Sequence, residues 1–79
     1  MHIKCLFPDD LIRRPIIYDL ATRFTLVSNI KQAQVTSEIG WVILEITGEE
    51  YEVSNGIEWL KQLGVTVEAL EKEDGNGKS

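Results

Sequence analysis

The chain has 79 residues, of which 43% are hydrophobic and 27% charged, and its formal net charge is −5. A chain this short builds one hydrophobic core, and its composition excludes wholesale disorder. The acidic balance argues against nucleic acid as a partner, because affinity for a polyanion depends on neutralised phosphates. No apolar run approaches the ~20 residues that a membrane-spanning helix needs, so membrane insertion is not expected.

The first segments predict a strand followed by a helix. Apolar residues occupy every second position of residues 2–7, which is the period of a strand with one buried face. Residues 8–10 (Pro-Asp-Asp) break this pattern. A helix is expected over residues 15–24, because proline suits a first helical turn and apolar residues recur behind it at helical spacing.

Residues 28–48 predict a β-hairpin. Its first strand, roughly residues 26–36, does not alternate cleanly, because Ile30, Ala33 and Val35 cannot all face one side of a regular strand. A bulge near Lys31 or Gln32 would resolve the conflict.

A turn is expected over residues 37–40. It leads to a strand in which Val42, Leu44 and Ile46 face the core and Trp41, Ile43 and Glu45 face the other way.

The last third of the chain predicts a second helix and a fourth strand. Glu49, Glu50 and Glu52 place negative charge in the first turn of this helix, where the helix dipole favours it. Gly64 is expected to end the helix. Val65 and Val67 then alternate inward on the last strand. We expect one domain over residues 1–71 and a frayed acidic, glycine-containing tail over residues 72–79, which contain no apolar side chain.

The order strand, helix, strand, strand, helix, strand predicts the α+β class and a ferredoxin-like βαββαβ sandwich. Right-handed crossovers put both helices on one face of a four-stranded antiparallel sheet. The uncovered face should carry Leu6, Trp41 and Ile43. An aromatic side chain flanked by aliphatic ones indicates an interface for a second copy or another domain. The alternative is that long polar side chains and the tail shield the tryptophan without any partner.

The residue types needed for catalysis or metal binding do not form a recognisable constellation. Cys5 and His2 are the single cysteine and histidine, so no disulfide, cysteine-rich metal site or histidine-based triad is expected. The terminal Gly-Lys-Ser lacks the earlier glycine and the following helix of a phosphate loop. Arg13 and Arg14 fit either an anion clamp or a solvated pair before the helix. We therefore expect a non-enzyme without a cofactor.

Several short motifs give the chain a family resemblance. They are Leu-Phe-Pro at 6–8, Arg-Pro-Ile-Ile at 14–17, Ser-Asn-Ile-Lys-Gln-Ala at 28–33, Val-Ile-Leu-Glu-Ile-Thr-Gly at 42–48 and Asn-Gly-Ile-Glu-Trp-Leu-Lys-Gln-Leu-Gly-Val-Thr-Val-Glu at 55–68. In this order and spacing, over roughly residues 2–71, they resemble a NIL domain. The tripeptide that gives the family its name reads Asn29-Ile30-Lys31 here, so its third position departs from the pattern.

The resemblance implies a regulatory rather than a catalytic role. NIL domains occur at the carboxyl end of the ATPase subunit of bacterial methionine importers, where they bind methionine, dimerise and inhibit transport. They also occur at the amino end of proteins with a four-cysteine iron–sulfur ferredoxin domain, and the Phe-Pro opening and the helix at 56–65 look more like this second group. No Cys-x-x-Cys run and no ATPase half are present, so neither an iron–sulfur cluster nor ATP hydrolysis is implied.

Two functions follow from this resemblance. The first is a homodimeric sensor of an amino acid such as methionine or another sulfur metabolite, with Asn29 and Ile30 as ligand contacts and Trp41 and Ile43 as an apolar wall or dimer seam. The alternative is a protein-interaction module whose sheet face docks a ferredoxin or another protein of sulfur metabolism without a small ligand. No secretory signal follows Met1, so a cytoplasmic location is expected.

Overall fold

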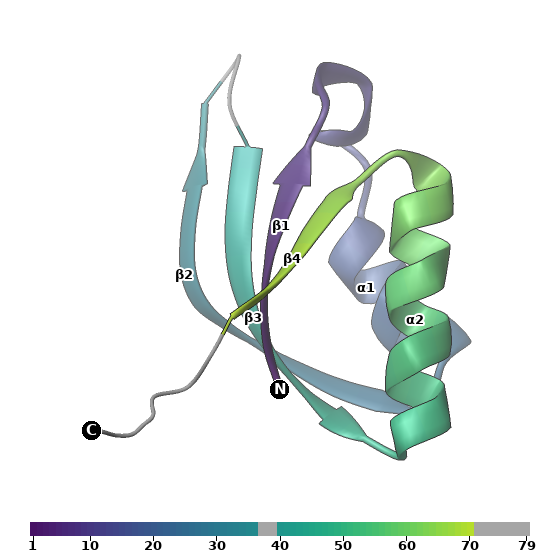
Figure 1. Ribbon diagram of the computed structural model, residues 1–79. Coiled ribbons are helices and arrows are strands. Elements are labelled where there is room, and N and C mark those ends of the chain that lie inside the picture. Colours follow the sequence, from purple (N-terminus) through teal and green to yellow (C-terminus); the bar gives the residue numbers. More distant parts are fainter. Residues whose placement is uncertain (37–39, 71–79) are drawn as a thin grey trace, which may run out of the picture.

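The computed structural model describes residues 1–36 and 40–70 and has the predicted order of elements (Figure 1). The strands form one antiparallel sheet in the order β2-β3-β1-β4, and both helices lie on the same side of it. The ferredoxin-like fold class is therefore confirmed. The elements are β1 (His2–Phe7), α1 (Ile16–Arg23), β2 (Leu26–Val35), β3 (Gly40–Gly48), α2 (Glu50–Leu63) and β4 (Thr66–Leu70).

The hydrophobic core lies between the sheet and the two helices. Every second residue of the two central strands, β1 and β3, faces the helices and forms the sheet side of this core, as the period of two predicts. The pairs Ile3–Leu44 and Cys5–Val42 stand opposite each other across β1 and β3, and all four side chains are buried. The complete set of buried hydrophobic residues is Ile3, Cys5, Leu11, Ile16, Leu20, Leu26, Val42, Leu44, Ile46, Leu60 and Val65.

The end of α2 shows why a glycine is needed there. Gly64 has φ 108°, a left-handed conformation that costs other residues energy, and its N–H donates to the carbonyls of Leu60 and Lys61. The N–H of Val65 also donates to Leu60 O, at 3.0 Å. The predicted helix end at Gly64 is confirmed, and it turns the chain directly into β4.

The irregularity predicted for β2 is present. Ile30 stands opposite Leu44 and Gln32 stands opposite Ile43, so Lys31 is the extra residue of a β-bulge. The bulge restores a common face to residues that simple alternation would separate. Ile30 and Ala33 both lie on the helix side of the sheet, opposite core residues of β3.

One segment differs from the sequence-based expectation. Asp9–Leu11 form a short 3₁₀ helix after β1, and Leu11 is buried in the core, whereas the sequence indicated only a break in the ladder. Of the predicted turn at residues 37–40, only Gly40 is described, and it begins β3. The predicted tail at residues 72–79 lies outside the described residues. Neither helix of the described part is long and apolar enough to cross a membrane.

Candidate functional site

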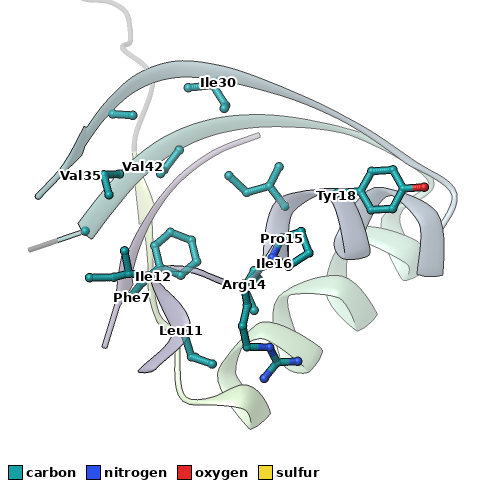
Figure 2. Close-up of a pocket in the computed structure, with 13 residues that line it drawn as sticks. Phe7, Leu11, Ile12, Arg14, Pro15, Ile16, Tyr18, Ile30, Val35 and Val42 are labelled. Atoms are coloured by element: carbon teal, nitrogen blue, oxygen red, sulfur yellow. The ribbon is translucent and has the colours of Figure 1, made fainter. Parts of the chain in front are cut away.

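A half-open cavity of about 260 Å³ lies between the β2–β3 hairpin and the start of α1 (Figure 2). The hairpin side is formed by Ile30, Ala33 and Val35 of β2 together with Val42 of β3. Pro15 and Tyr18 are among the residues on the opposite side. The cavity is near the lower end of the ~300–1,000 Å³ typical of small-molecule sites, so its size suits a small metabolite.

The lining of this α1–β2 cavity is mostly apolar. Its charged member is Arg14, which is exposed and whose guanidinium extends away from the hairpin in Figure 2. Ile30 and Val35 contribute to the wall although they are 58% and 57% exposed, so the outer side of the cavity is open to solvent. An apolar group with one polar or anionic end is the ligand chemistry that this lining favours.

The two residues expected to contact a ligand lie on opposite faces of the sheet. Asn29 stands opposite Glu45 on the uncovered face, whereas Ile30 stands opposite Leu44 on the helix face. Ile30 lines the α1–β2 cavity, and Asn29 does not. Neighbouring residues of a strand point in opposite directions, so one cavity cannot use both unless the ligand reaches around the edge of the sheet.

The three residues expected at an interface do come together. Leu6 of β1 pairs with Trp41 of β3, and Ile43 is two residues farther along the same strand, all on the face that the helices leave uncovered. Leu6 is exposed, whereas Trp41 and Ile43 are half-buried. The ammonium of Lys4 lies 4.9 Å from the centre of the Trp41 ring, a cation–π contact that covers part of the indole.

Other reactive groups do not form a site in the described part of the chain. Cys5 is fully buried, and burial raises the pKa of its thiol to about 11, so it is a poor nucleophile at neutral pH. The described residues contain no cluster of three or more side chains suited to hold a metal ion. Arg13 and Arg14 are both exposed, and only Arg14 contributes to the α1–β2 cavity.

Comparison with known proteins gives the family of the chain. The model of the NIL domain family matches residues 2–69. The chain belongs to the NIL domain family. The match supports a regulatory role for this NIL domain.

A solved structure supports the same fold. The C-terminal domain of an ABC transporter ATP-binding protein from Enterococcus faecalis has a TM-score of 0.74 and 24% sequence identity, with 85% of this chain and 79% of that chain covered. A comparison with curated protein sequences gives no match.

Sequence reasoning missed the α1–β2 cavity of this NIL domain. Residues at the cavity, such as Phe7, Ile12 and Ile17, come from segments that are far from β2 in sequence, and no local motif links them. The available signal was the set of apolar residues Ile30, Ala33 and Val35 on β2, which conflict with strict alternation.

Proposed function

We propose that this NIL domain is a cytoplasmic regulatory domain that senses an amino acid with an apolar side chain, such as methionine or another sulfur metabolite. The observation that carries the proposal is the α1–β2 cavity, which is small, apolar and open at one side. In the proposed complex the apolar side chain of the ligand occupies the cavity, and the polar end remains at the open side.

The polar end of such a ligand has two candidate contacts. Arg14, the charged member of the lining, can pair with a carboxylate if its exposed side chain turns from the orientation in Figure 2 toward the ligand. Asn29 stays in the proposal as a hydrogen-bonding group, since β2 is an edge strand and a ligand at its outer side can contact both faces. Ile30 is the proposed apolar contact.

Isothermal titration calorimetry with methionine tests this proposal. Ala33→Trp should abolish saturable binding, because the larger side chain fills the cavity that Ala33 lines. Gln34→Trp is the matched control, since Gln34 is the next residue of β2 and lies on the opposite face, beside Trp41. The control should bind like the wild type. Absence of heat up to millimolar methionine, or unchanged binding by Ala33→Trp, would refute the proposed site.

A second candidate function is a protein-interaction module that uses the uncovered sheet face. Leu6, Trp41 and Ile43 form a continuous apolar strip there, and a ferredoxin or another protein of sulfur metabolism is the candidate partner. Ile43→Glu should then prevent capture of a purified candidate partner without unfolding the domain. Unchanged capture by this variant would exclude the strip as the docking surface.

A further inference from the structure

The first half of helix α2 contains the dipeptide Asn55-Gly56, and the packing of the domain requires its glycine. Gly56 is buried where α2 packs on Leu20 of α1 and Leu26 of β2. A Cβ added at Gly56 would lie 2.9 Å from Leu26 Cδ1 and 3.1 Å from Leu20 Cδ1. Asn55, in contrast, is exposed. Close packing therefore fixes the glycine of this dipeptide, and the asparagine is in contact with water.

An Asn-Gly dipeptide is especially prone to deamidation. The backbone nitrogen of the glycine attacks Cγ of the asparagine and forms a C–N bond, and the side-chain nitrogen leaves as ammonia with the proton of the glycine N–H. The product is a five-membered cyclic imide. Water then opens this ring at either carbonyl and gives aspartate or isoaspartate. Glycine favours the attack because it has no Cβ to hinder the approach, and no enzyme or cofactor is needed.

The helical backbone of α2 blocks this reaction. In an α-helix each N–H donates to the carbonyl four residues earlier, so the nitrogen of Gly56 is engaged with the carbonyl of Glu52. Ring closure also needs a rotation about ψ of Asn55 that a helix, with ψ of about −42°, does not permit. The dipeptide can therefore react only when this part of α2 opens.

The first half of α2 has little intrinsic tendency to be helical. Residues 53–56 are Val-Ser-Asn-Gly, and all four have lower helix propensity than alanine or leucine. The N-cap residue, Glu49, makes no side-chain hydrogen bond to the first turn. Tertiary packing, including that of Gly56, rather than propensity, holds this half of the helix closed.

We infer that Asn55 is a deamidation site that α2 protects, and that opening of the helix converts it to aspartate or isoaspartate. Isoaspartate leads the main chain through the former side chain and so inserts an additional methylene between Asn55 and Gly56. Gly56 then cannot return to its place against Leu20 and Leu26 while the preceding turn keeps its own position. The isoaspartyl chain does not rebuild α2, so the fraction of time that α2 is open sets the lifetime of the folded domain.

Mass spectrometry of samples incubated at neutral pH measures the conversion. Trypsin cleaves after Lys31 and Lys61, so the peptide of residues 32–61 contains Asn55 and no other asparagine. Asn55 should convert at least about tenfold more slowly in buffer than in concentrated urea, because opening a helix that is packed on the core costs free energy. Equal rates in the two solutions, or no conversion in urea, would overturn the inference.

Ser54→Ala tests whether opening of α2 controls the rate. Ser54 is exposed, so alanine stabilises the helix without changing the core. The conversion of Asn55 in buffer should become about twofold slower, and the rate in urea should stay the same. A rate in buffer that this variant leaves unchanged would refute control by the helix.

Asn55→Gln is the matched control for the consequence of the reaction. Glutamine closes its larger ring far more slowly and suits an exposed helical position. Both proteins are kept in urea until Asn55 of the wild type has converted, and are then refolded. The other two asparagines, Asn29 and Asn76, age equally in both proteins. The wild type should recover less helical circular dichroism than Asn55→Gln, and equal recovery would refute the inferred loss of α2.

Discussion

Raising the pH should destabilise this domain through Cys5. The side chain is fully buried in the middle of β1, and burial raises the pKa of its thiol from 9.0 to about 11. The unfolded chain therefore loses this proton at lower pH than the folded chain does. Between pH 9.0 and about 11 the unfolded state binds fewer protons, so the free energy of unfolding falls as the pH rises.

The size of the effect follows from the shift. A change of about two units corresponds to about 3 kcal/mol. The total free energy of unfolding expected for a domain of this size is about 4–12 kcal/mol, so the loss is a substantial fraction of it.

Urea unfolding followed by circular dichroism at a series of pH values measures this loss. The Cys5→Ala variant is the reference, because the other groups that titrate in the same range are common to both proteins and cancel in the difference. We expect the stability of the wild type relative to Cys5→Ala to fall by about 2 kcal/mol between about pH 8 and pH 11, where the folded thiol is itself half ionised. A difference that stays constant over this range would refute the argument that burial controls the thiol.

Three further predictions concern the packing of the domain. Gly64→Ala should lower the free energy of unfolding by about 1 kcal/mol or more, because φ is 108° at this position. Gly64→Asn should lower it by less. Equal stability of the wild type and both variants in thermal melts would contradict this prediction. Gly48→Ala should lower the free energy of unfolding measured in urea by about 1–3 kcal/mol. The added Cβ would lie 2.7 Å from Leu26 Cδ2 and 2.9 Å from the backbone oxygen of Thr25. A variant as stable as the wild type would show that the end of the strand relaxes freely. A double-mutant cycle of Lys4→Ala and Trp41→Ala should give a coupling energy of about 0.5–1 kcal/mol, and strict additivity would show that the cation–π contact is not stabilising.

Local sequence signals were sufficient for the fold. The alternation in β1 and β3, the glycine after α2 and the conflict among apolar residues of β2 are each visible within about ten neighbouring positions, and the structure confirms what they predicted. Leu11 was missed because a three-residue 3₁₀ helix is too short to show a periodic pattern.

The candidate site could be predicted only in part. Leu6, Trp41 and Ile43 share a face because alternation and strand order fix their directions. The α1–β2 cavity depends on how closely α1 approaches the hairpin, which no local pattern encodes. The pair Asn29 and Ile30 was chosen from a family motif, and a motif of adjacent residues carries no information about which face each side chain occupies.

The extra residue in β2 also affects how relatives of this chain should be compared. A homologue without the extra residue would keep strict alternation through this strand. Its inward-facing residues align with Ala33 and Val35 of this chain only when the alignment opens a gap at Lys31. An alignment without that gap would match inward-facing positions of one protein with outward-facing positions of the other from Gln32 to Val35. Ligand preferences inferred from such an alignment would be assigned to the wrong side of the sheet.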